Sequence, residues 1–298
     1  MTDRNLTTRN WDMTTNPMIK TGVVDVGGGT RGIYGAGIFD YFLDHSIRFD
    51  YLAGVSAGSA NGVSFLAGQR GRNYRFYDTY AFRKEYMSFR NLLRIGSYVD
   101  LDYIYGTLSN AGGEDPVDFE AFQANPARME IVATDARTGK AVYFSKEDIR
   151  KDEYHFLKAS SCVPVACRPY PIGSRCYYDG GISDPIPFRR ALEAGCDKVV
   201  VILTRPKDTL RKPGKDPYFA RLLKRRYPAA ARALDRRAET YNRSLEEALA
   251  LEREGKLLIL APDSIDGLKT LTQDHGKLEE LYRKGMADAA RVPAFLNP

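Results

Sequence analysis

Long hydrophobic runs are missing from this chain of 298 residues. The longest, Val199–Leu203, has the length of a strand, whereas a membrane-spanning helix needs about 20 apolar residues. Residues 1–18 are polar, rich in Thr and Asn, and lack the apolar segment of a signal peptide. We therefore expect a flexible lead-in over residues 1–18, a cytoplasmic protein, and membrane contact that is peripheral rather than spanning.

Cysteine and histidine are scarce. The four cysteines show no C-x-x-C spacing and no nearby histidine, so we expect reduced thiols, no metal site and no disulfide framework. Cys162 and Cys167 lie close enough to leave a redox pair as the lesser alternative to packing. His45 precedes Ser56 and does not suit the Ser, Asp, His order of α/β-hydrolases, and neither His155 nor His275 has a glycine-rich or acidic context that marks it out. A histidine-dependent triad is therefore disfavoured.

Positive charge is concentrated in one segment of the chain. Residues 205–256 carry 15 Lys or Arg and 8 Asp or Glu, which accounts for the whole net charge of +6. A basic face suits an anionic membrane surface or an anionic substrate. A solvated pair of helices with mixed charges explains the same composition equally well. No nucleic-acid-binding module accompanies the basic residues, so nucleic acid is not an expected partner.

Strand and helix patterns alternate along the chain. Strands are predicted over 23–26, 49–55, 198–203 and 256–260, a hairpin over 130–136 and 140–145, and helices over 33–43, 57–66 and 274–290. Such alternation predicts an α/β fold, a three-layer sandwich with a mostly parallel central sheet and helices on both faces. We expect a catalytic core over residues 19–203 and a helical, basic C-terminal elaboration packed on it over 204–298.

The segment Gly54-Val55-Ser56-Ala57-Gly58 fits G-x-S-x-G, in which a serine lies on a sharp turn between a strand and a helix. Gly54 and Gly58 are a steric requirement of that turn, and the helix N-terminus favours the negative charge that develops during attack. The pattern predicts Ser56 as a nucleophile. The competing interpretation is a glycine-rich turn with an incidental serine.

A second glycine-rich turn admits two interpretations. It comprises Gly27, Gly28, Gly29, Thr30, Arg31 and Gly32. As G-x-G-x-x-G after a strand, with Asp50 near the distance of a ribose-binding acid, it predicts an NAD(P) site and an oxidoreductase. As a run of bare amides, it predicts an oxyanion hole. No Gly-Lys-Ser/Thr follows, which disfavours a Walker-type phosphate loop.

A nucleophilic serine needs a base, and a carboxylate is the remaining choice. Asp179 follows an apolar approach and precedes Gly180 and Gly181, in a loop that could hold a carboxyl against a serine hydroxyl. A turn residue in an Asp-Gly pair is the alternative.

Tyr and Phe are dense between Tyr74 and Tyr105, where ten of them alternate with arginines. These rings could line an acyl groove, although packing against the sheet is the commoner role of an apolar stripe.

The three motifs occur in one order, and together with the stretch from Ala159-Ser160-Ser161 to the prolines before Asp179 they resemble the patatin-like phospholipase family. The resemblance runs over about residues 23–203 and implies the patatin-like fold. It implies Ser56 as nucleophile, Asp179 as its base, and an oxyanion loop over Gly27–Thr30 that Arg31 helps to hold. Val26 departs from the family's Asp before its glycines.

By that resemblance the substrate is a lipid ester, cleaved through an acyl-enzyme without a metal or organic cofactor. Acyl transfer to an acceptor other than water uses the same chemistry. A catalytically silent lipid-binding protein would keep the same fold, and the oxidoreductase remains the other alternative.

Overall fold

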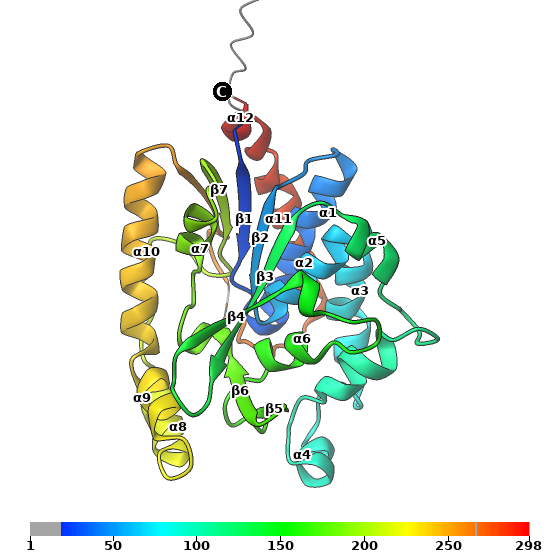
Figure 1. Cartoon of the computed structure of the whole chain (residues 1–298), viewed down its shortest axis with the longest axis vertical. Coiled ribbons are helices and arrows are strands. Elements are labelled where there is room, and N and C mark those ends of the chain that lie inside the picture. Colours follow the sequence, from blue (N-terminus) through cyan, green and yellow to red (C-terminus); the bar gives the residue numbers. More distant parts are fainter. Residues whose placement is uncertain (1–18, 266, 298) are drawn as a thin grey trace, which may run out of the picture.

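The structure is a computed structural model that describes residues 19–265 and 267–297, so the predicted lead-in over 1–18 lies outside the described residues. One sheet of eight strands forms its centre (Figure 1). The strands are β1 (Thr21–Asp25), β2 (Tyr51–Val55), β3 (Arg128–Asp135), β4 (Ala141–Ser145), β5 (Tyr170–Ile172), β6 (Arg175–Asp179), β7 (Lys198–Ile202) and β8 (Leu257–Leu260).

The strand order is β5-β6-β3-β2-β1-β7-β8, with β4 paired to β3 outside this path. The pairs that join β3, β2, β1, β7 and β8 are parallel. The pairs that involve β4, β5 and β6 are antiparallel. The mixed, mostly parallel sheet and the hairpin of β3 and β4 confirm the prediction, whereas β5 and β6 were not predicted.

Helices cover both faces of the sheet because successive strand residues point to opposite sides. Val23 belongs to the core beneath α1 (Ile33–Asp44), α2 (Ala57–Leu66) and α11 (His275–Ala289). Val24 belongs to the core beneath α7 (Phe188–Glu193) and α10 (Arg237–Arg253), on the other side in Figure 1. The three-layer arrangement is confirmed, and α1, α2 and α11 lie within a residue or two of their predicted bounds.

The remaining α-helices lie around the sheet. They are α3 (Arg72–Asp78), α4 (Phe89–Ile95), α5 (Phe119–Ala124), α6 (His155–Ser160), α8 (Asp216–Leu223), α9 (Pro228–Asp235) and α12 (Val292–Leu296). Figure 1 shows α4 and α8 protruding at the same end of the molecule. Among the described residues, no helix is both long enough and apolar enough to cross a membrane.

The chain beyond residue 203 contributes to both faces of the sheet. Its strand β8 extends the sheet next to β7, α10 covers one face, and α11 packs along α1. The division of the chain at residue 203 stays a prediction.

Candidate active site

Ser56 connects β2 to α2 in a conformation that few residues other than glycine adopt, with φ 56° and ψ −129°. The flanking glycines are needed because the chain folds tightly on itself here. A Cβ on Gly54 would lie 2.5 Å from the Cα of Ser59, and one on Gly58 would lie 2.2 Å from the backbone oxygen of Asp25. The predicted strand–turn–helix is therefore present, with the serine at its apex.

The register of β3 brings Ser56 and Asp179 together. On one edge of β3, Val132 pairs with Val55 at the end of β2, and the next residue, Ala133, pairs with Asp179 at the end of β6. Both strands use this edge because β4 occupies the other. Since β2 and β6 approach from opposite directions, their last residues meet, and the serine that follows β2 lies beside the aspartate that ends β6.

Asp179 is buried, with only 6 % of its surface exposed. Burial raises the pKa of its carboxyl, and interactions with the Ser56 hydroxyl and the Gly181 N–H oppose that rise. Its Oδ1 accepts a hydrogen bond from the Gly181 N–H at 2.8 Å. A Cβ on Gly180 would lie 2.3 Å from the Val132 oxygen, so the Asp-Gly-Gly sequence fits closely against β3.

Ser160, which sequence reasoning gave no individual role, fastens the turn at Ser56. Its hydroxyl accepts a hydrogen bond from the Ser56 N–H at 2.8 Å and donates one to the Val132 oxygen at 2.6 Å. The Ser59 hydroxyl lies 3.0 Å away. The Ser56 amide is therefore already engaged, and an oxyanion would need other donors.

The glycine-rich turn follows β1 at the same end of the sheet. Gly27, Gly28 and Gly29 have φ values of 62°, 127° and 63°. A Cβ on Gly27 would lie 2.3 Å from the Val55 oxygen, and one on Gly29 would lie 2.0 Å from the Thr270 oxygen. Backbone conformation and space both exclude side chains from this turn.

Only part of this turn has free amides. The Gly27 N–H donates to Oδ1 of Asp25 at 2.8 Å, and the Thr30 N–H donates to the Thr270 oxygen at 2.8 Å. Within the described residues, the Gly28 and Gly29 amides donate to no other group. The stretch predicted over Gly27–Thr30 therefore narrows to its two middle amides as available donors.

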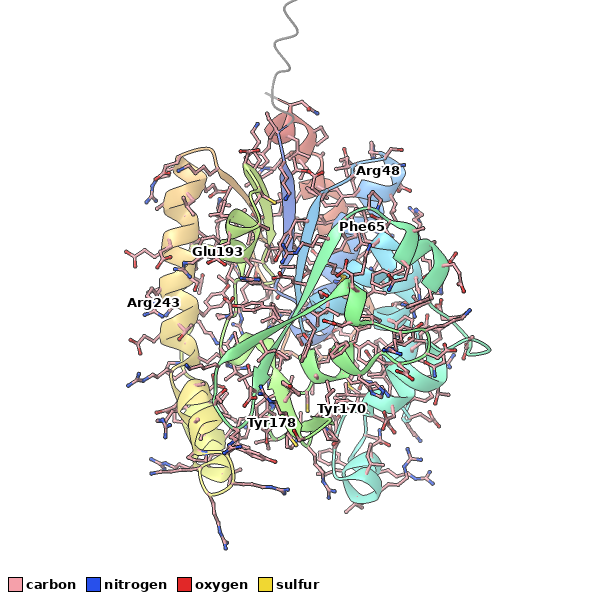
Figure 2. The ribbon with its side chains drawn as sticks, in the orientation of Figure 1. Arg48, Phe65, Tyr170, Tyr178, Glu193 and Arg243 are labelled. Carbon is pink, nitrogen blue, oxygen red and sulfur yellow. The ribbon has the colours of Figure 1, made fainter. Side chains whose placement is uncertain are left out.

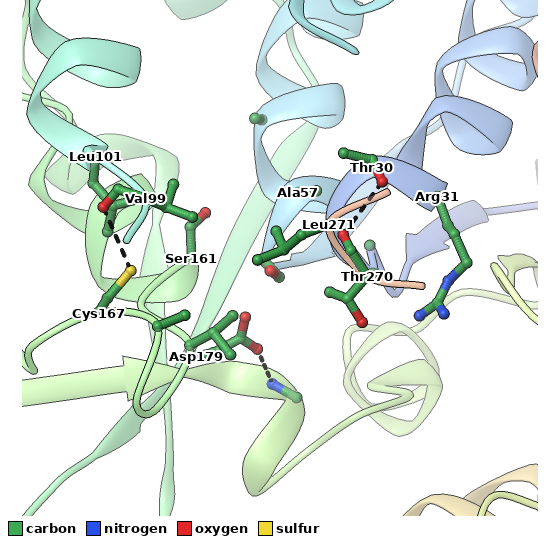
Figure 3. A pocket seen from close by; sticks show the side chains of 18 of the residues that line it. Thr30, Arg31, Ala57, Val99, Leu101, Ser161, Cys167, Asp179, Thr270 and Leu271 are labelled. Atoms are coloured by element: carbon green, nitrogen blue, oxygen red, sulfur yellow. Dashed lines mark hydrogen bonds between the residues drawn. The ribbon is translucent and has the colours of Figure 1, made fainter. Parts of the chain in front are cut away.

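Arg31 helps to hold the turn against the segment that contains Thr270. Its guanidinium donates to the Leu268 oxygen at 3.4 Å, next to the bond that Thr30 makes with Thr270 (Figure 3). Only 4 % of its surface is exposed. Burial, followed by repulsion from neighbouring arginines, lowers the pKa of Arg31 to about 9.

Asp25 is a further residue that sequence reasoning missed. Its carboxylate accepts hydrogen bonds from the Gly27 N–H and from Nδ2 of Asn61, which also donates to the Gly32 oxygen. The Tyr77 hydroxyl donates to Oδ1 of Asn61. Burial raises the pKa of Asp25 to about 6. An acidic residue at the end of an apolar strand was the available signal for this buried network beneath the turn.

Ser56, Asp179 and the glycine-rich turn line one cavity of about 1080 Å³. One side, the apolar wall, comprises Phe76, Val99, Leu101, Ile104, Tyr105 and Val163. The other, the cationic wall, comprises Arg31, Arg205, Arg211, Lys215 and Arg237. In Figure 3, Val99 and Leu101 lie on one side of Asp179 and Arg31 lies on the other.

The aromatic segment supplies much of the lining. Six of its ten rings line the cavity, namely Phe76, Tyr77, Tyr86, Phe89, Tyr98 and Tyr105. Others pack elsewhere, since Tyr74 meets Tyr282 edge to face and Phe82 stacks on His275. The segment is thus divided between the cavity and contacts with α11, and its role as an acyl groove stays a prediction.

The histidines and Asp50, which the sequence offered as alternative functional residues, lie outside this cavity. All three histidines are among the described residues and none lines the cavity; His45, for example, stacks on Tyr41. Asp50 precedes β2 and accepts hydrogen bonds from Thr21, so it lies at the opposite end of the sheet from the glycine-rich turn. It cannot act as the ribose-binding acid of that turn. In the described part of the chain, no three His, Cys, Asp or Glu side chains cluster as metal ligands.

Two family models match this sequence. The model of the patatin-like phospholipases matches residues 26–192, and that of a domain of unknown function, DUF6363, matches residues 227–294. In fold, the chain is similar to VipD from Legionella pneumophila, with a TM-score of 0.52 and 14 % identity over 94 % of this chain and 67 % of VipD.

Two curated relatives extend the likeness. The uncharacterized protein YjjU of Escherichia coli is 31 % identical over 202 residues, 63 % of this chain and 52 % of YjjU. The lysophospholipase NTE1 of Debaryomyces hansenii is 25 % identical over 283 residues, 90 % of this chain and 17 % of NTE1. The chain thus spans about half the length of YjjU and much less of NTE1. Because the family model covers more than half of the chain, this protein belongs to the patatin-like phospholipase family.

Proposed function

We propose that this protein hydrolyses carboxylic esters of lipids, with Ser56 as the nucleophile and Asp179 as its general base. The observation that carries the proposal is the meeting of β2 and β6 on one edge of β3. Nearby are the Gly28 and Gly29 amides, which donate to no group in the part of the chain that the structure describes. Family membership and the similarity to a lysophospholipase support a lipid ester as the substrate. The position of Asp50 at the far end of the sheet speaks against the dinucleotide alternative.

The reaction follows from the groups at hand. Asp179 takes the proton of the Ser56 hydroxyl as its oxygen bonds to the ester carbonyl carbon. The carbonyl oxygen becomes negative and accepts hydrogen bonds from the Gly28 and Gly29 amides. The protonated Asp179 then gives its proton to the departing alcohol, which leaves an acyl-enzyme. Water, deprotonated by Asp179, releases the fatty acid and restores the serine.

The environment of the two groups suits these roles. Burial raises the pKa of Asp179, which makes the carboxylate a stronger base than an exposed one. The strained turn at Ser56 is held by Ser160 and the two flanking glycines, so the hydroxyl is presented without rearrangement of the backbone.

The cavity opening beside α4 suits a lipid surface. Phe89 is 77 % exposed and Leu93 is 90 % exposed, and Phe89 also lines the cavity. Arg90 and Arg94 belong to the same helix. At the same end of the molecule, α8 exposes Tyr218 and Leu222 beside Arg221 (Figure 1). We infer that this end docks on an anionic bilayer, where apolar side chains insert and arginines meet lipid phosphates.

The test of the proposed function is loss of turnover in Ser56→Ala. We expect hydrolysis of p-nitrophenyl butyrate to fall by about three orders of magnitude or more, and labelling by a fluorophosphonate probe to disappear. Ser161→Ala is the matched control, since Ser161 lines the same cavity and its hydroxyl contacts Tyr105 instead of a carboxylate. Its labelling should persist.

Melting curves of both variants establish that they fold. Turnover by Ser56→Ala at the wild-type rate would refute the nucleophile. A wild-type protein that neither hydrolyses esters nor reacts with the probe would favour a catalytically silent lipid-binding protein.

A further inference from the structure

The cationic wall holds more positive charge than the protein neutralises. Among the described residues near it, Asp216 is the carboxylate that pairs with the wall. Arg237 binds both oxygens of Asp216, at 2.8 and 2.5 Å. Arg211 lies 3.7 Å from one of them, and Arg205 forms no ion pair with any described residue. Four arginines and Lys215 thus share one acidic partner.

Buried polar atoms on this wall lack partners. These atoms are Nε of Arg31 and Nε of Arg211, and the hydroxyl of Tyr241, which lines the cavity beside Arg211, is in the same state. All three are inaccessible to solvent and bonded to no group in the described part of the chain. Arg31 and Tyr241 are each only 4 % exposed. An unpaired buried donor weakens the fold by about 1–3 kcal/mol, and movement of these side chains toward a bound acceptor would relieve that cost.

The wall adjoins the candidate catalytic groups. It lines the same cavity as Ser56 and Asp179. The guanidinium of Arg31 lies beside Gly28, where a Cβ would be 3.4 Å from its terminal nitrogen. An anion held here would lie next to the glycine-rich turn, on the side of the cavity away from the apolar wall (Figure 3).

We propose that Arg31, Arg205, Arg211 and Tyr241 form a phosphate subsite that takes the phosphoryl group of an anionic glycerolipid while its ester lies at Ser56. A phosphoryl group offers more oxygens than a carboxylate, which suits a wall of several guanidinium groups. The hydrolytic part rests on the proposed function, whereas the anion subsite does not.

Binding can be tested without turnover. In the Ser56→Ala protein, inorganic phosphate at ten times its Kd should raise the melting temperature by about 3 °C, and sodium chloride at equal ionic strength should not. Adding Arg205→Gln with Arg211→Gln should remove the increase. Arg205→Gln alone should make the increase in melting temperature smaller. This single substitution leaves the ion pairs of Asp216 intact. Arg243→Gln is the matched control, because Arg243 is exposed on α10, away from the cavity (Figure 2).

A missing increase in Ser56→Ala, or an increase that survives Arg205→Gln with Arg211→Gln, would overturn the subsite. A second measurement identifies the source of the phosphate. The quantity to measure is the ratio of kcat/KM for lysophosphatidic acid to kcat/KM for a monoacylglycerol with the same acyl chain. We expect this ratio to fall by about one to two orders of magnitude in Arg205→Gln and to stay unchanged in Arg243→Gln.

The two measurements separate the possible failures. An unchanged ratio together with arginine-dependent phosphate binding would overturn the lipid phosphate and leave free phosphate as the ligand. A wild-type protein that cleaves neither ester would refute the proposed function, while the melting experiment would still decide whether the anion subsite exists.

Discussion

The two walls of the cavity differ in chemistry and in their origin along the chain. The apolar wall comes from residues 76–163, within the patatin-like match, as do Ser56 and Asp179. Of the cationic wall, only Arg31 lies in that match, and the other four residues follow it, between 205 and 237. The part of the chain that is shared with the family supplies the candidate chemistry and the apolar wall, and the part beyond supplies most of the positive charge of the cavity.

This difference suggests how a lipid would lie in the cavity. The ester would be at the junction of the walls, with its acyl chain along the aromatic and aliphatic side and its phosphate against the arginines. Burial of each methylene contributes about 0.8 kcal/mol, and a charge-assisted hydrogen bond contributes about 1.5–3 kcal/mol. The two walls can therefore contribute comparable selectivity, for chain length on one side and for head group on the other.

The largest effect on activity is expected from replacing Asp179, the candidate base. Asp179→Asn keeps an oxygen that can accept the Gly181 N–H but loses the base, so kcat should fall by about 10²–10⁴-fold. The loss should be equal for neutral and anionic esters, because the base serves both. Steady-state rates on the two ester classes, with a melting curve for the variant, check this. Activity within threefold of wild type would show that another group removes the proton.

The second-largest effect is expected from a substitution in the apolar wall, and it should depend on the length of the acyl chain. Val99→Trp fills part of the acyl surface, and exclusion of three methylenes would lower kcat/KM for long-chain esters roughly fiftyfold. Butyrate esters, which are too short to reach the added ring, should be affected far less. A series of p-nitrophenyl esters from butyrate to palmitate measures the change, with Val99→Leu as the conservative control. A uniform loss over the series would place the acyl chain elsewhere.

The sequence predicted the parts of this site that are local in the chain. The turn around Ser56 and the helix after it follow from small residues between an apolar strand and a helical pattern. The strand β6 that delivers Asp179 was not predicted, because it is short and starts with polar residues, and its edge partner β5 contains Pro171. The register that joins both strand ends on β3 is a long-range property that no local pattern specifies.

The cationic wall was only partly visible in the sequence. The excess of basic residues over 205–256 was evident, and the structure divides these residues between the cavity and the outer surface. Arg205, Arg211 and Arg237 line the cavity, whereas Arg225 and Arg243 are solvated on the outside. Which arginines point inward depends on the packing of α8 and α10 around Asp216, and the order of residues does not reveal it.

A smaller effect concerns the entrance shared by both walls. Replacing Phe89 and Leu93 by serine removes two exposed apolar side chains from α4, so binding to vesicles that contain phosphatidylglycerol should weaken about tenfold. Co-sedimentation measures the binding, and butyrate hydrolysis in solution reports on the intact site. Ile19→Ser is the control, since Ile19 is an exposed apolar residue beside the start of β1, at the other end of the sheet. If Ile19→Ser weakened vesicle binding equally, α4 would have no special role in that binding.

The smallest effect links the cationic wall to the candidate base. Burial raises the pKa of Asp179, and among the opposing influences are the charges of Arg237 and Arg211. A base works only when deprotonated, so activity should fall as the pH drops through this pKa. Arg211→Gln removes one of those charges, the carboxyl becomes harder to ionise, and the acid limb should move to higher pH. Profiles of kcat/KM against pH for butyrate hydrolysis, each normalised to its own plateau, measure the shift. A limb that stays in place would mean that solvent screens the arginines from Asp179, so that the two walls act independently and the cationic wall contributes to binding alone.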